Sequence, residues 1–141
     1  MDLALLTGQR PAEVLKLKPT DIRDGALWII QNKTGARLGI EITDELAATI
    51  ARINERPRPT ISAYLIQNEN GQPLTQCALR SRFDKARTLV KVDFQFRDIR
   101  AKAATDTGDL AHSQILLGHK NREMTEHYVK SRTGERVRPL R

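Results

Sequence analysis

The stretch Leu116–Tyr128, near the end of this 141-residue chain, constrains the fold most strongly. Its sequence, LLGHKNREMTEHY, predicts the end of one helix, a glycine stop, a histidine and a short helix that Asn121 caps and that presents a tyrosine. A tyrosine in such a helix can simply pack against its neighbours. It becomes a candidate nucleophile only if the rest of the chain supplies positive charge that binds a phosphate beside it.

The chain is basic, with a formal net charge of +7 and a sequence pI near 10.0. Because each neutralised phosphate releases bound counterions, this charge favours a polyanionic partner, although membrane surfaces and acidic proteins attract the same charge. The basic residues are interspersed with apolar ones, which places them on a folded surface. A length of 141 residues with 39% hydrophobic content suffices for one domain with its own core.

The sequence contains no membrane-spanning or secretory signal. No apolar run approaches the ~20 residues that span a bilayer, and the apolar stretch at residues 1–6 is too short for a signal peptide. The single cysteine, Cys77, has no second cysteine in the chain to pair with, which favours a reducing compartment. We therefore expect a cytoplasmic protein.

The first segment combines a helix end with an arginine at the start of a second helix. Residues 2–6 resemble the last turns of a helix that Gly8 stops, so we expect a piece of a longer protein with a truncated first helix. A proline favours the next helix over 11–17, with Arg10 at its entrance and Glu13 three residues on. This pair is either a surface ion pair, which stabilises little, or an arginine that the carboxylate orients.

A β-hairpin is predicted next. Residues 26–31 and 36–42 are rich in strand-forming side chains, and the turn residues 32–35 separate them. Lys33 lies in this turn. A lysine there is usually just solvated, but a hairpin can also carry a mobile ammonium group to a bound phosphate.

The remaining segments are mainly helical. We expect helices over 43–54, 75–91, 97–108 and 109–117, capped in the first, second and fourth cases by Thr43, Thr75 and Asp109, and a short strand over 63–66. The predicted fold is α+β and mainly α, one helical domain over 1–130 with a small sheet on one side. A basic tail over 131–141 is expected to be mobile or docked on a partner.

Two arginines begin the predicted helix at 97–108. Arg97 and Arg100 lie one turn apart, near the positive end of the helix dipole. Two adjacent guanidinium groups repel each other unless an anion joins them, and Asp98 offsets only part of that repulsion. The pair therefore predicts an anion site.

Several cations together with one phenol suit phosphoryl transfer. Guanidinium groups bind the phosphate oxygens in pairs, a lysine gives a proton to a leaving alkoxide, and a histidine donates to a non-bridging oxygen. A tyrosine, with an ordinary pKa near ~10, is a poor nucleophile, but nearby cations favour its phenolate. The candidates are Arg10, Lys33, Arg97, Arg100, His119 and Tyr128. Because arginines carry the charge, we expect no metal and no other cofactor.

Other reaction classes fit the sequence less well. None of the three histidines belongs to an HExxH pair, and one cysteine cannot complete a zinc motif. The sequence has no P-loop and no GxSxG serine elbow. It also has no cluster of closely spaced carboxylates of the kind that binds magnesium in nucleases.

Four segments, in this order, resemble the catalytic domain of a tyrosine recombinase of the phage-integrase family. Residues 7–17 match the family's box T-G-x-R-x-x-E-hydrophobic-x-x-L, and residues 32–35 match the hairpin that carries its catalytic lysine. Residues 97–100 occupy the H-x-x-R box, and residues 116–119 with the tyrosine at 128 match the L-L-G-H…Y box. The resemblance covers nearly the whole chain.

The resemblance assigns a role to each matched residue. It implies that Tyr128 attacks the scissile phosphate to give a 3′-phosphotyrosine and a free 5′-hydroxyl, and that Lys33 protonates the leaving oxygen. The phosphate would be bound by Arg10, which Glu13 supports, together with Arg100 and His119. The resemblance also implies double-stranded DNA as partner, a homotetramer on DNA, a bacterial or phage origin, and an N-terminal DNA-clamping domain that is missing here. Candidate DNA contacts are Arg80, Arg82, Lys102 and Lys120.

Arg97 departs from the family pattern, because it stands where the family usually has histidine. That histidine is thought to assist removal of the tyrosine proton, and a guanidinium group cannot act as a base near neutral pH. It can still bind phosphate. We therefore expect retained but altered chemistry. The alternatives are a weak or inactive DNA-binding module of the same fold, or a basic scaffold that binds acidic proteins.

Overall fold

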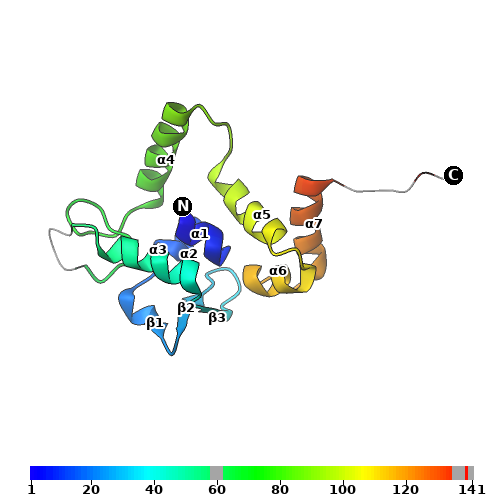
Figure 1. Ribbon diagram of the computed structural model, residues 1–141, viewed down its shortest axis with the longest axis horizontal. Helices are drawn as coiled ribbons and strands as arrows, with labels where there is room; N and C mark the ends of the chain where they lie inside the picture. Colours follow the sequence, from blue (N-terminus) through cyan, green and yellow to red (C-terminus); the bar gives the residue numbers. More distant parts are fainter. Residues whose placement is uncertain (58–61, 135–138, 140–141) are drawn as a thin grey trace.

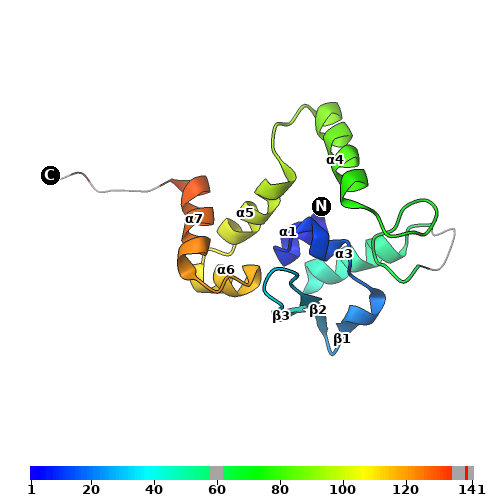
Figure 2. The same cartoon turned by 180° about the vertical axis from the view of Figure 1, so that it is seen from behind.

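The computed structural model describes residues 1–57, 62–134 and 139, and it places a small sheet at one side of a group of helices (Figures 1 and 2). Helices α1, α2 and α3 gather with the sheet, whereas α5, α6 and α7 form a second group. Helix α4 projects away from both groups, and the loop between β2 and β3 reaches toward α6 (Figure 1). This architecture confirms the predicted α+β, mainly helical class.

The first two helices place Arg10 between them. Helix α1 (Asp2–Thr7) ends where predicted, at Gly8, whose φ of 63° is left-handed and suits glycine. Helix α2 (Pro11–Val14) is shorter than the predicted 11–17. The backbone is extended at Lys18, because a proline disfavours helical backbone in the residue before it. Pro19 then opens a 3-10 turn, η1 (Pro19–Asp21).

The sheet has three antiparallel strands in the order β1-β2-β3: β1 (Ile22–Arg23), β2 (Ala26–Ile30) and β3 (Arg37–Glu41). Strands β2 and β3 form the predicted hairpin, with Trp28 opposite Gly39. Strand β1 was not predicted, because two residues are too few for a periodic pattern. It pairs with β2 across a tight turn in which Asp24 and Gly25 both have positive φ.

The middle of the chain differs from the prediction in two places. Helix α3 (Asp44–Asn54) begins after Thr43, but the Thr43 side chain makes no capping hydrogen bond. The predicted strand at 63–66 is wrong: those residues form bends, and the Leu65 amide donates to the Leu17 carbonyl over 2.8 Å. This backbone contact and the buried Leu65 side chain attach the segment to the chain after α2, but they do not form a strand ladder.

Aromatic packing joins α4 (Gln76–Val90) to α5 (Phe96–Asp106). The Phe83 ring meets the rings of Phe94 and Phe96 edge to face, at centroid distances of 5.4 and 5.3 Å. Helix α4 begins as predicted, because the Thr75 hydroxyl accepts a hydrogen bond from the Ala78 amide over 3.1 Å.

The last two helices, α6 (Leu110–Leu117) and α7 (Arg122–Thr133), pack against α5. The predicted caps are confirmed: Asp109 accepts from the Ala111 amide and Asn121 from the Glu123 amide. Helix α7 continues to Thr133, three residues into the predicted basic tail. Residues 135–138 and 140–141 of that tail lie outside the described residues.

One apolar cluster joins the two groups of helices to the sheet. Buried side chains from α1, β2, α3 and α5 meet in it, among them Leu3, Leu27, Ile29, Leu46 and Ile99. Burying each such side chain contributes roughly 1.5–3 kcal/mol. Since Ile99 is anchored in this cluster, Arg100, the next residue on α5, is fixed relative to α1.

No helix in the described part of the chain is long and apolar enough to cross a membrane.

Candidate active site

A buried carboxylate orients Arg10 at the start of α2. The Glu13 side chain is 1% exposed, and its Oε2 accepts a hydrogen bond from the Arg10 amide over 2.8 Å. Its Oε1 lies 3.3 Å from Arg10 Nη1. Because the carboxylate is buried and binds both the backbone and the side chain of Arg10, the pair is not a solvated surface pair.

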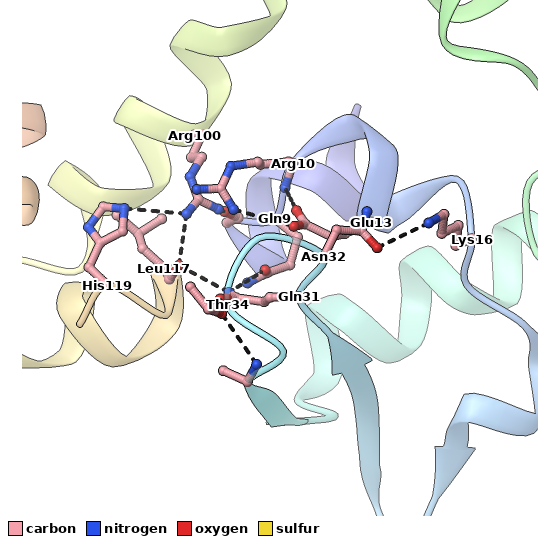
Figure 3. Close-up of polar contacts among 12 residues, drawn as sticks. Gln9, Arg10, Glu13, Lys16, Gln31, Asn32, Thr34, Arg100, Leu117 and His119 are labelled. Carbon is pink, nitrogen blue, oxygen red and sulfur yellow. Dashed lines mark hydrogen bonds and ion pairs between the residues drawn. The ribbon is translucent and has the colours of Figure 1, made fainter.

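The Arg100 guanidinium is buried and held by backbone carbonyls. Its Nη1 donates to the Gly8 carbonyl, its Nη2 donates to the Leu117 carbonyl over 2.8 Å, and Nη2 also lies 3.4 Å from His119 Nε2. These contacts engage three of its five N–H groups. Burial, and then the charge of Arg10, lower the pKa of Arg100, while Tyr128 acts in the opposite direction. Figure 3 shows the Arg10 and Arg100 side chains next to each other.

His119 follows the glycine stop of α6, and both its ring nitrogens are engaged. Nδ1 lies 2.9 Å from the hydroxyl of the buried Thr125. Since a guanidinium group can only donate, the Nε2 that faces Arg100 accepts, and the proton is on Nδ1. Burial above all, then the charges of Arg100, Arg10 and Lys33, lower the pKa of His119 to about 4. The imidazole is therefore neutral at pH 7.

Tyr128 reaches the two arginines from α7. Its ring centroid lies 5.4 Å from that of His119, with the rings tilted by 35°. The half-buried tyrosine lines a hollow of about 290 Å³, which we call the arginine hollow. Its other lining residues are Ala4, Gln9, Arg10, Pro11, Ala12, Gln76, Phe96, Arg97, Ile99 and Arg100. Three segments distant in sequence, at the starts of α2 and α5 and on α7, thus bring three arginines and one phenol to one place.

The remaining predicted catalytic residues are more exposed. Arg97 lines the arginine hollow and also a neighbouring hollow of about 530 Å³ that Arg80 and Arg87 of α4 line. Lys33 is exposed in the hairpin loop and does not line the arginine hollow, but its charge contributes to lowering the pKa of His119.

The four predicted DNA contacts lie on different parts of the structure. Arg80 lines the larger hollow with Arg97, and Lys120 is exposed next to His119. Arg82 and Lys102 instead form ion pairs, with Glu69 over 2.6 Å and with Asp106 over 2.5 Å. These two cations are therefore partly neutralised within the chain. No group of three potential metal-binding side chains occurs among the residues that the structure describes.

Sequence reasoning missed the polar residues that join these segments. Gln9 and Gln31 are buried and hydrogen-bonded to each other over 2.9 Å, and Thr125 supports His119 (Figure 3 shows both glutamines). The only signal for Gln31 is a polar residue directly after an apolar strand, which is common in turns. Gln9 falls inside a matched box, but at a position where the box accepts any residue.

This chain is similar to known proteins in sequence and in structure. A sequence model of the phage integrase family matches residues 1–135. The integrase of Escherichia phage HK022 is 34% identical over 148 residues, which cover 96% of this chain and 41% of that protein. The chain thus spans about two fifths of the length of that relative.

Solved structures of lambda integrase share the fold. A lambda integrase dimer bound to a COC′ core site matches with a TM-score of 0.81 and 27% identity, over 98% of this chain and 53% of that one. A lambda integrase tetramer bound to a Holliday junction matches with a TM-score of 0.80 and 25% identity, over 97% and 43%. With the family match over most of its length, the chain belongs to the phage integrase family of tyrosine recombinases.

Proposed function

We propose that this chain is the catalytic domain of a site-specific recombinase, which cleaves and rejoins DNA strands through a 3′-phosphotyrosine intermediate during DNA integration or excision. The observation that carries the proposal is the arginine hollow, where Tyr128 lies with Arg10 and Arg100. Three guanidinium groups at one phenol suit a phosphodiester, because negative charge grows on its oxygens in the transition state.

Each step can be assigned to residues of this chain. The phenol oxygen of Tyr128 forms a bond to phosphorus, and the bond from phosphorus to the 5′-oxygen breaks. The Lys33 ammonium donates its proton to that oxygen, which leaves as a 5′-hydroxyl. Arg10 and Arg100 bind the non-bridging oxygens. Attack by a 5′-hydroxyl of a partner duplex reverses the step and completes strand exchange.

His119 contributes as a neutral group in the resting site. Its Nε2 accepts from Arg100, so in this state it presents no proton to a substrate. A bound phosphate that draws Arg100 Nη2 to its own oxygens would free Nε2. The negative charge of the phosphate would also raise the pKa of His119 and favour the imidazolium, which donates to a non-bridging oxygen.

Arg97 changes how the phenol proton leaves. A guanidinium group cannot accept it, so the proton passes to solvent, and Arg97 instead adds positive charge that binds the phosphate. We therefore propose an active enzyme whose cleavage step depends more steeply on pH than it would with histidine at position 97.

DNA as partner and assembly on it are part of the proposal. The similar lambda integrase structures include a dimer on a core site and a tetramer on a Holliday junction. The basic chain, with Arg80 and Arg97 lining adjoining hollows, offers a path for the DNA backbone. The logarithm of the DNA-binding constant should fall with the logarithm of the salt concentration, with a slope of about −0.9 per phosphate contacted. A scaffold for acidic proteins contacts no DNA phosphates, so this relation would not apply to it.

A trapping experiment tests the enzyme. The full-length protein is incubated with a pool of nicked duplexes of random core sequence, in which the strand released after cleavage is too short to rejoin. We expect a covalent protein–DNA adduct that Tyr128→Phe abolishes. Tyr64→Phe is the matched control, because Tyr64 is the other tyrosine and its ring faces Lys18, not the arginine hollow.

The trapping experiment also distinguishes an active recombinase from an inactive DNA-binding module of the same fold. An adduct that persists in Tyr128→Phe, or no adduct despite salt-sensitive DNA binding, would contradict the enzyme. The second result would favour an inactive DNA-binding module, which Arg97 would then explain.

A further inference from the structure

Two buried glutamines connect the segments that carry the proposed catalytic groups. Gln9 Nε2 donates to the Leu116 carbonyl over 2.7 Å and to the Thr7 carbonyl over 2.8 Å. Its Oε1 accepts from Gln31 Nε2, which also donates to the Leu117 carbonyl over 3.0 Å. This glutamine clasp, Gln9 with Gln31, therefore links the start of α2, the hairpin and the end of α6 (Figure 3).

The clasp and Arg100 share one acceptor. The Leu117 carbonyl accepts from Gln31 Nε2 and from Arg100 Nη2, over 3.0 and 2.8 Å. Any shift of Gln31 relative to α6 would therefore move the hairpin relative to the phosphate-binding guanidinium. The next residue is glycine for a related reason: a Cβ on Gly118 would collide with the Gln31 amide.

Gln31 also shapes the loop that carries Lys33. Its backbone amide donates to the Ala36 carbonyl over 3.0 Å, and its carbonyl accepts from the Gly35 amide over 2.8 Å. Its side-chain Oε1 accepts from the Thr34 hydroxyl over 3.1 Å. Lys33 lies between Gln31 and Thr34 in the chain, inside the loop that these contacts close. It has no hydrogen bond or ion pair of its own with another described residue. Its placement thus depends on the loop.

We propose that Gln31 is a positioning residue for the proton donor Lys33, and that Gln9 supports it. The proposal rests on the proposed strand-cleaving function and adds a residue to it. Gln31 does not line the arginine hollow, so its effect passes through the hairpin. A polar clasp suits this task, because each hydrogen bond fixes a direction that an apolar contact between the same segments would leave free.

The leaving group provides the test. An alkoxide leaves slowly without a proton, but a thiol has an ordinary pKa near ~8.5, so a 5′-thiolate leaves unaided. DNA in which sulfur replaces the bridging 5′-oxygen therefore removes the need for Lys33. A defect that acts through Lys33 disappears on this substrate, whereas a defect in folding or phosphate binding persists.

We expect Gln31→Met to slow covalent cleavage of ordinary DNA by ~10–100-fold, as a displaced catalytic group does. On the sulfur substrate its rate should return to within about threefold of wild type, as should that of Lys33→Ala. Gln31→Met combined with Lys33→Ala should be no slower on ordinary DNA than Lys33→Ala alone. Gln72→Met, an exposed glutamine on another loop, is the matched control.

Thr34→Val keeps the test decisive if Gln31→Met unfolds. This change removes the Thr34 contact to Gln31 Oε1 at the loop and leaves the buried amide pair in place. It should give a smaller slowing that the sulfur substrate again removes. An equal slowing on both substrates, or no slowing in either variant, would overturn the positioning role. Absence of any adduct with the wild-type protein would instead refute the proposed function itself.

Discussion

Replacing Glu13 by glutamine tests whether a buried carboxylate orients Arg10. The carboxylate accepts from the Arg10 amide over 2.8 Å and lies 3.3 Å from its guanidinium, and the Glu13 side chain is 1% exposed. Glutamine has nearly the same size but only one acceptor oxygen. When that oxygen faces the Arg10 amide, the glutamine NH₂ group faces a guanidinium that can only donate.

The expected loss follows from these contacts. A hydrogen bond to a charged group contributes ~1.5–3 kcal/mol net, and solvent screening reduces this value because Arg10 is 29% exposed. We expect the free energy of unfolding to fall by ~1–2 kcal/mol, and Tm therefore to fall by roughly 3–8 °C for a domain of this size. Since Arg10 would no longer be oriented beside Arg100, covalent cleavage should slow by ~10-fold or more.

The control asks whether the burial of an ion pair or its short distance determines its contribution to stability. Thermal unfolding followed by circular dichroism is measured for Glu13→Gln and for Glu69→Gln. The Glu69–Arg82 ion pair is shorter, at 2.6 Å, but its side chains are 73% and 51% exposed, so its loss should leave Tm unchanged. If both variants had the same Tm, or if Glu69→Gln lost more stability, the assignment of a stabilising role to burial at Glu13 would be refuted.

Four further predictions concern His119, Arg97 and Arg80. His119 should titrate near pH 4 by ring ¹⁵N NMR, with its neutral form protonated on Nδ1, and Thr125→Val should weaken that preference. Because the folded state binds fewer protons than the unfolded state between the ordinary His pKa of 6.5 and about 4, Tm should fall as pH falls through this window, and less so in His119→Asn. Arg97→His should speed single-turnover cleavage near pH 7 and shift its rise to lower pH, because imidazole can accept the phenol proton; superimposable pH–rate profiles would exclude this role. Arg80→Ala should reduce the salt slope of DNA binding by ~1 without changing the unfolding transition, and an unchanged slope would remove Arg80 from the DNA interface.

The sequence predicted those features that local chemistry determines. Gly8 and Gly118 end helices because their left-handed backbone suits glycine, and Asp109 and Asn121 cap helices with their own side chains. The hairpin followed from strand-forming residues on either side of a turn. The matched boxes also indicated which side chains to seek in one site.

The contacts that assemble the site could not be predicted in this way. Arg100 is held by the carbonyl of Gly8, which lies 92 residues away, and every residue has such a carbonyl. Gln31 is buried only because the end of α6 meets the hairpin. In the same way, the ion pairs of Arg82 and Lys102 depend on where other segments place their carboxylates. Sequence identified the chemical groups, whereas tertiary packing determines which of them meet.

The proposed function requires that Tyr128 becomes covalently bonded to a DNA 3′-phosphate. The most direct measurement is tandem mass spectrometry of the trapped complex after nuclease trimming, together with labelling of the released DNA end by polynucleotide kinase. We predict a nucleotide attached through its 3′-phosphate to the peptide that contains Tyr128, and a 5′ end that kinase labels without prior phosphatase treatment. An adduct on any other residue, or a released 5′-phosphate, would contradict the account.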